Sequence, residues 1–269
     1  MNAAHVYRPS NAATISVMTL AMMLSLASAT SIVEAGFVAQ AGFNDASGIN
    51  SNATPNSPYT LGGPVGGAGV GEPVWSGPWQ SDSVANVVVT SPVFEGDGAA
   101  RLNPTSGTGR ELIQHLNGKF QVEQYVQFAA GARLVTYTEQ APGGNALQGP
   151  IWQAFADGKF YVIDGVEDAG SPPSQFTGFT WQPGVWYKVD ILGDMTTRTW
   201  DFFLNDIKYI PPNPLGFRGS PAYIDRVFYQ SEGSGSVFLD AVTIVPEPSS
   251  LVLAAFGFIG LVVWGWRRK

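Results

Sequence analysis

The sequence contains no cysteine, and this absence excludes disulfide frameworks, cysteine-based zinc sites and thiol catalysis. Only two histidines are present, His5 near the start and His115 in the body of the chain. A histidine cluster for a metal is therefore excluded, and a catalytic triad would have a single candidate base. Because no G-x-S-x-G turn accompanies His115, we expect this residue to be structural or exposed.

Charge is also scarce. Charged residues make up 13% of the 269 residues, which disfavours a coiled coil or a highly charged disordered chain. Four of the 14 basic residues and one of the 21 acidic residues lie outside residues 30–245, which leaves 10 basic against 20 acidic residues in that segment. Such a negative segment repels phosphate backbones, and it has no basic stripe, so we expect no nucleic-acid partner.

Helical periodicity is missing as well, because 32 glycines and 19 prolines interrupt the chain too often for long helices. Short apolar or alternating runs take their place, and residues 120–128 alternate as a half-buried strand does. Tight turns are predicted at residues 156–159 and 193–197. The predicted strands span residues 36–43, 84–90, 120–128, 133–139, 151–156, 159–163, 185–192, 199–204, 223–230 and 237–245.

About ten strands with one apolar face each can bury those faces against one another, so the sequence predicts an all-β, two-sheet antiparallel sandwich over residues 30–245. Within this domain, residues 44–78 are rich in Gly, Pro, Asn and Ser. Residues 62–71 contain six glycines in ten positions, but prolines bracket them and no helical pattern follows. We therefore interpret the segment as a loop and not as a phosphate-binding motif.

The N-terminal end has the composition of a secretory signal peptide, residues 1–29. Arg8 precedes an almost wholly apolar run at residues 15–26, and Ala27-Ser28-Ala29 supplies the small residues that signal peptidase recognises. The apolar run is shorter than the roughly 20 residues that span a bilayer, which disfavours an uncleaved anchor. We expect cleavage after Ala29, with Ala35 as the alternative.

The C-terminal end combines three pieces in order. The motif Pro246-Glu247-Pro248-Ser249-Ser250 comes first, residues 251–266 form an apolar run that predicts a transmembrane helix, and residues 267–269 are basic. The positive-inside rule keeps the basic end in the cytoplasm, so the domain before it faces outward. A plain single-span anchor is the alternative, although such an anchor needs no Pro-Glu-Pro motif and usually has a longer apolar stretch.

This order of motif, helix and basic end resembles the PEP-CTERM sorting signal over residues 246–269. The resemblance implies that an exosortase-like enzyme processes the chain at a sorting motif formed by Pro246, Glu247 and Pro248. It also implies a Gram-negative bacterium that makes extracellular polysaccharide. The chain would be anchored transiently in the inner membrane and then left at the outer surface or in the extracellular matrix.

Three segments of the predicted domain resemble strands of the concanavalin A-like jelly roll, the sandwich of lectins, glucanases and laminin-G domains. They are residues 184–191 (GVWYKVDI), 199–206 (TWDFFLND) and 235–244 (GSVFLDAVTI). Asp206 stands where the family usually has a glycine after the asparagine, so that turn is altered. The resemblance implies a jelly-roll fold and does not by itself imply an activity.

Sugar binding would use exposed aromatic rings, whose apolar faces stack on pyranose C–H groups while amides and carboxylates hold the hydroxyls. The candidates that lie outside clean strand interiors are Trp75, Trp79, Trp152, Trp181 and Tyr59. The competing interpretation is that these rings fill the space between the sheets.

Calcium is the favoured ion, because it needs only oxygen ligands, although no cofactor is required. By resemblance to carbohydrate-binding jelly rolls, Asp240 on the closing strand would bind calcium together with Asn44 and Asp45. No EF-hand spacing supports such a site. In the alternative interpretation, Asp240 caps a strand or pairs with a neighbouring base.

Catalysis is not expected. Sandwiches of this type that hydrolyse glycans carry carboxylates at alternate positions of one strand, and no predicted strand has such a row. We therefore expect an exported surface or matrix protein with a structural or adhesive role and weak contacts to polysaccharide. The alternative is a secreted glycan hydrolase whose carboxylates come together from different strands.

Overall fold

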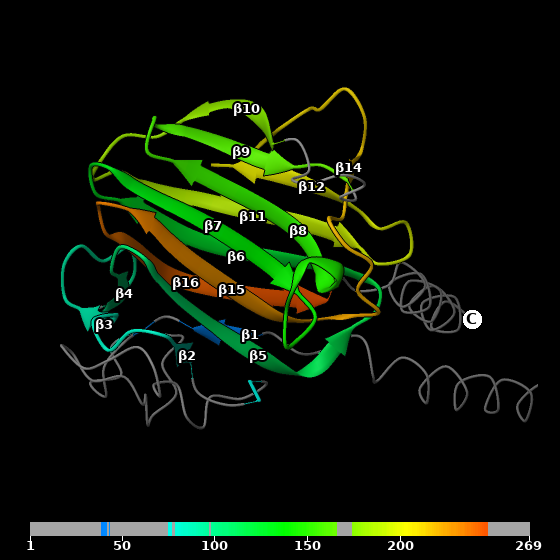
Figure 1. Cartoon of the computed structure of the whole chain (residues 1–269), viewed down its shortest axis with the longest axis horizontal. Coiled ribbons are helices and arrows are strands. Elements are labelled where there is room, and N and C mark those ends of the chain that lie inside the picture. The colour runs from blue at the N-terminus through cyan, green and yellow to red at the C-terminus, as the bar shows by residue number, and fades with distance from the viewer. Residues whose placement is uncertain are drawn as a thin grey trace, which may run out of the picture. The chain divides into compact units, whose positions relative to one another are not determined.

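Two antiparallel β-sheets pack face to face in the computed structural model (Figure 1). The predicted signal peptide, most of residues 44–78 and residues 247–269 lie outside the part of the chain that the structure describes. That part lies within the unit Phe37–Glu247 and comprises residues 39–41, 43, 75–76, 79–96, 98–165 and 174–246.

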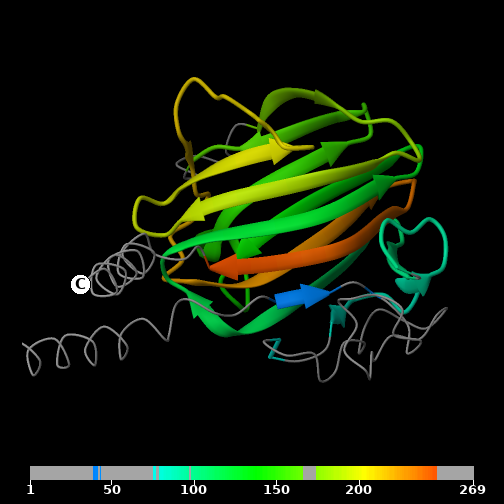
Figure 2. The same ribbon diagram turned by 180° about the vertical axis from the view of Figure 1, so that it is seen from behind.

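Sheet 1 faces the viewer in Figure 2. Two short strands extend it, since β1 (Ala39–Ala41) pairs with β16 and β14 (Leu215–Gly216) pairs with β12. In spatial order its strands are β13 (Ile207–Lys208), β12 (Thr199–Leu204), β11 (Trp186–Asp194), β6 (Lys119–Phe128), β16 (Val237–Pro246), β4 (Ala99–Leu102) and β3 (Val87–Val89).

Sheet 2 faces the viewer in Figure 1. Among the described residues, the only helical element is η1 (Asn145–Leu147), a short 3-10 turn that precedes β8. In spatial order the strands of sheet 2 are β10 (Ser174–Thr180), β9 (Lys159–Ile163), β8 (Gln148–Phe155), β7 (Ala132–Glu139), β15 (Ile224–Gly233), β5 (Ser106–Leu116) and β2 (Gln80–Ser81).

Alternation along the strands places the core between the sheets. In β6, Phe120, Val122, Val126 and Phe128 are buried, whereas the side chains between them, except Gln124 and Gln127, are only partly buried or exposed. The buried inward residue Gln124 is not apolar, and its Oε1 accepts a hydrogen bond of 2.6 Å from the Tyr229 hydroxyl on β15. One polar contact therefore joins the two sheets through the core.

The predicted all-β fold and two-sheet antiparallel sandwich are confirmed. All ten predicted strands overlap observed strands, although the predicted runs 36–43 and 84–90 shorten to β1 and β3. Both predicted turns are also present, since β8 and β9 are joined by residues 156–158, and β11 and β12 by residues 195–198. The sequence does not predict β4, β5, β10 or the two-residue strands β2, β13 and β14.

Candidate functional site

The four tryptophans expected to stack on sugars lie in the core. Trp75, Trp79, Trp152 and Trp181 are 4%, 1%, 0% and 5% exposed, respectively. The guanidinium of Arg110 lies 4.7 Å from the ring centre of Trp75 and 5.9 Å from that of Trp79. A ring without an exposed face has no surface for a pyranose, so we correct the prediction: these rings pack the sandwich. Tyr59 lies outside the described residues.

Asp240 is buried on β16, at a bulge where Ala241 has a φ of 47°. Its Oδ2 accepts hydrogen bonds of 3.1 Å from the backbone N–H groups of Phe94 and Glu95, and its Oδ1 accepts one of 2.8 Å from Ala241. Burial raises the pKa of Asp240 to about 7, although these bonds oppose the shift. This carboxylate therefore holds the segment of Phe94 against sheet 1.

The other proposed calcium ligands, Asn44 and Asp45, lie outside the described residues, so the calcium interpretation stays a prediction. Within the described ranges, no group of three or more His, Cys, Asp or Glu is placed to hold a metal ion.

His115 lies near the end of β5 and is half-exposed. Its ring stacks on Tyr223 at 3.6 Å between ring centres, and its Nε2 lies 3.6 Å from Asp225 Oδ2. Asp225 also accepts a 2.7 Å hydrogen bond from the backbone N–H of Ala141. The contacts of His115 join the end of β5 to the start of β15, and the Ala141 bond joins the turn after β7 to the same residue of β15, so His115 has a structural role.

The outer face of sheet 2 carries a row of cross-strand neighbours that no sequence pattern indicates. The register aligns Gln230 of β15 with Val135 of β7, then Gln153 of β8, Tyr161 of β9 and Phe176 of β10. Neighbouring side chains in such a row stand on the same face of a sheet. Five strands thus present amide, apolar and aromatic groups along one line.

Aromatic rings gather along this row and beside it. The ring centres of Phe155 and Tyr161 are 4.6 Å apart, those of Tyr161 and Phe176 are 5.7 Å apart, and those of Tyr137 and Phe228 are 6.0 Å apart. Four of these rings are half-buried, and Phe176 is 45% exposed. We call Tyr137, Phe155, Tyr161, Phe176 and Phe228 the aromatic face.

Ion pairs flank the aromatic face. Arg133 lies 2.9 Å from Glu232, and Arg226 lies 3.1 Å from the buried Glu139. Burial raises the pKa of Glu139, and Arg226 opposes that shift. The two carboxylates stand six residues apart along the paired strands, or about 20 Å at the rise of a β-strand. That separation is too large for the two carboxylates of a glycosidase.

The outer face of sheet 1 brings carboxylates from different strands onto one lysine. Lys188 Nζ lies 3.0 Å from Glu123, 3.3 Å from Asp190 and 2.9 Å from Asp206. Desolvation lowers the pKa of Lys188, but the three carboxylates outweigh it and raise the pKa above its usual value. Burial raises the pKa of Asp190. Glu123 and Asp190 are direct cross-strand partners, and Lys188 neutralises part of their charge.

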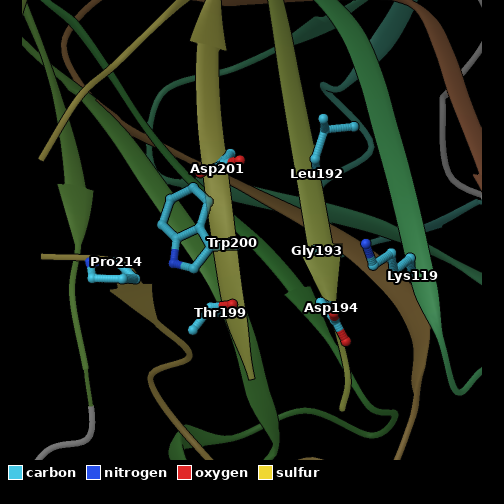
Figure 3. Close-up of a pocket in the computed structure, with 8 residues that line it drawn as sticks. All are labelled: Lys119, Leu192, Gly193, Asp194, Thr199, Trp200, Asp201 and Pro214. Atoms are coloured by element: carbon cyan, nitrogen blue, oxygen red, sulfur yellow. The ribbon is translucent and has the colours of Figure 1, made fainter. Parts of the chain in front are cut away.

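A pocket of about 260 Å³ opens where β6 and β12 begin and β11 ends (Figure 3). In Figure 3 the Trp200 indole lies toward Pro214. The carboxylates in its lining are engaged, because Asp201 accepts a 2.7 Å bond from Lys208 and Asp194 accepts a 2.8 Å bond from the backbone N–H of Thr196. The pocket therefore offers no free acid and base pair.

The C-terminal residues carry the decisive comparison. A family model described as the PEP-CTERM protein-sorting motif matches residues 245–269. The chain ends in a PEP-CTERM motif. This confirms the resemblance expected from the sequence, and Pro246, Glu247 and Pro248 lie within the match. The motif marks an exported protein of the bacterial cell envelope. Pro246 ends β16, whereas Glu247 and Pro248 lie outside the described residues.

No helix in the described ranges is long and apolar enough to cross a membrane. The predicted transmembrane helix, residues 251–266, and the predicted signal peptide lie outside those ranges, so both stay predictions.

No curated protein matches the chain. Among solved structures, a sialidase is 11% identical with a TM-score of 0.47, and the match covers 63% of this chain but only 17% of the sialidase. The carbohydrate-binding module CBM66 from Bacillus subtilis is 10% identical with a TM-score of 0.41, over 62% of this chain and 94% of the module. A galectin from Caenorhabditis elegans is 13% identical with a TM-score of 0.38, over 54% of this chain and 94% of the galectin.

Proposed function

We propose that the protein is an exported, exosortase-processed component of the outer surface or extracellular matrix of a Gram-negative bacterium. The observation that carries this proposal is the C-terminal sorting motif at residues 245–269. Signal peptidase would remove residues 1–29, and residues 251–266 would anchor the chain transiently in the inner membrane. The domain has a structural or adhesive role and does not catalyse a reaction.

The aromatic face is the surface that we assign to polysaccharide. Arg133 lies 4.4 Å from the ring centre of Phe155, and Arg226 lies 4.7 Å from that of Phe228. We therefore assign the stacking on sugars to Tyr161 and Phe176, with the amide groups of Gln153 and Gln230 on the same face. The Tyr161 hydroxyl donates a 3.0 Å hydrogen bond to Asp157, which holds this ring in place. Because the rings are already ordered in the sheet, contact with a glycan costs little side-chain entropy.

Binding of the full-length chain in detergent to the host's own extracellular polysaccharide and to a glycan array tests this assignment. We expect the double variant Tyr161→Ala, Phe176→Ala to bind at least ~10-fold more weakly, since both rings are accessible. The control is Phe203→Ala, which removes a half-buried ring from the outer face of sheet 1. Equal binding by the double variant and the control would refute the aromatic face as the contact, and parallel measurements with calcium and with a chelator test the calcium interpretation.

A second candidate function is a secreted glycan hydrolase, and the observation that favours it is the cross-strand pair of Glu123 and Asp190. The two carboxylates come from different strands and meet at one lysine, which fits an acid and a nucleophile close together. Reducing-sugar release from the same glycans separates the two functions. Activity that disappears in both Glu123→Gln and Asp190→Asn would establish the hydrolase, whereas our proposal expects no release by the wild-type chain.

A further inference from the structure

The first residues of the sorting motif are part of the folded sandwich. Val245 and Pro246 begin the segment that the motif matches, and they are also the last two residues of β16. Their register partners on β6 are Gln121 and Phe120. The motif therefore does not begin on a free linker, because its first two residues occupy places in sheet 1.

The end of β16 is less buried than the strand residue before it. β6 pairs with it, through Gln121 opposite Val245 and Phe120 opposite Pro246. Ile244 is 1% exposed, whereas Val245 and Pro246 are only partly buried. Pro246 also has no N–H to donate to a neighbouring strand. Strand ends that are only partly buried open at low free energy, so these two residues can leave β6 without unfolding of the core.

A processing enzyme that takes an extended peptide uses the same backbone groups that a neighbouring strand uses. We propose that the end of β16 is a gate for the sorting enzyme, and that residues 245–246 must separate from β6 before the motif is processed. This inference rests on the proposed function, because it concerns the same sorting step. It adds that the folded domain sets the rate of that step.

Locking the gate tests the proposal. Val245 and Gln121 are cross-strand partners whose side chains both lie on the outer face, and Cα atoms of such partners are about 4.5–5.5 Å apart, a distance that a disulfide spans. The natural chain has no cysteine, so Val245→Cys with Gln121→Cys can form only this one bond within the chain. We expect the double variant, produced in a host that holds the sorting enzyme, to be processed at least about tenfold more slowly than wild type.

The matched controls are the two single variants, Val245→Cys and Gln121→Cys, which carry the same substitutions without the bond. Both should be processed at nearly the wild-type rate, as followed by immunoblot of the full-length and shortened forms. The proposal is overturned if the bonded double variant keeps the rate of the single variants. It is equally overturned if the two cysteines fail to pair, because the register would then be wrong. If the wild-type chain is never processed in that host, the proposed function itself fails.

A linker insertion tests the same proposal in the opposite direction, because it should make processing faster. A short Gly-Ser linker between Val245 and Pro246 frees the motif from β6 and leaves the rest of β16 in place. We expect several-fold faster processing. The same linker inserted after Ile210, which is 83% exposed, is the control and should leave the rate unchanged. An unchanged or slower rate for the Val245 insertion would contradict the gate.

Discussion

Asp240 is a carboxyl group that the sandwich buries and supplies with three backbone N–H donors. Its pKa of about 7, compared with an ordinary value of 3.8, means that the folded state binds the proton more tightly than the unfolded state does. The stabilisation from this proton is complete below pH 3.8 and is lost as the pH rises to about 7.

We therefore expect the unfolding free energy of the wild type to fall between pH 4 and pH 7 relative to that of Asp240→Asn, by up to about 4 kcal/mol. Burial also raises the pKa of Glu139, Asp190 and Asp225. The wild type and the Asp240→Asn variant share these three groups, so the difference between their unfolding free energies reports on Asp240 alone. Denaturant unfolding in the presence of a chelator measures it. Parallel pH profiles for the two chains would contradict this assignment.

At the scale of the element, β5 depends on two glycines that make room for a ring of the aromatic face. A Cβ at Gly109 would lie 2.7 Å from Phe228 Cδ2 and 2.8 Å from the carbonyl oxygen of Val227, and a Cβ at Gly107 would lie 2.5 Å from Phe228 Cζ. Phe228 therefore lies directly over β5. The glycines shape the outer face of sheet 2 even though they weaken a strand intrinsically.

Gly109→Ala should destabilise the domain by about 1–3 kcal/mol, because the backbone carbonyl of Val227 cannot move aside as a flexible side chain can. Gly118→Ala in the turn before β6 is the control, since a Cβ there meets no atom within 4 Å. Thermal unfolding of both variants measures the difference. Equal melting temperatures would show that the Phe228 ring does not hold the position described.

The same strand explains where prediction from sequence stops. β6 and β12 are predictable because apolar residues recur at the alternate positions that the sandwich buries. In β5 the inward residues include Ser106, Thr108 and Arg110, all buried, so the expected pattern of apolar and polar residues is absent. Arg110 is buried against Trp75 and Trp79, which lie far from it in the sequence, so this contact becomes visible only in the tertiary structure.

The candidate site shows a similar limit. The sorting motif is readable because its residues are adjacent in the chain. The aromatic face draws its rings from five strands, and cross-strand register alone makes them neighbours. The sequence favours large aromatic residues such as Trp152 and Trp181 as sugar-binding candidates, but both are buried in the core of the sandwich. Smaller rings at the alternate positions of plain strands occupy the surface.

At the scale of the whole molecule, the sorting motif governs where the domain is found. Deletion of residues 247–269 leaves β16 complete, so the domain should still cross the inner membrane and should appear in the soluble periplasmic fraction instead of at the outer surface. Fractionation of the host, with the full-length chain as the control, measures the distribution. Recovery of the unprocessed full-length chain from the soluble cytosolic fraction would contradict export.

The pairing of β1 with β16 places Ala39 opposite Ile244, so the polypeptide enters and leaves the sandwich through neighbouring strands. Any fluorescent protein or affinity tag fused just ahead of β1 would crowd the site that the sorting enzyme needs. A reporter for live imaging is better inserted at the exposed Ile210, where it leaves both chain ends unobstructed.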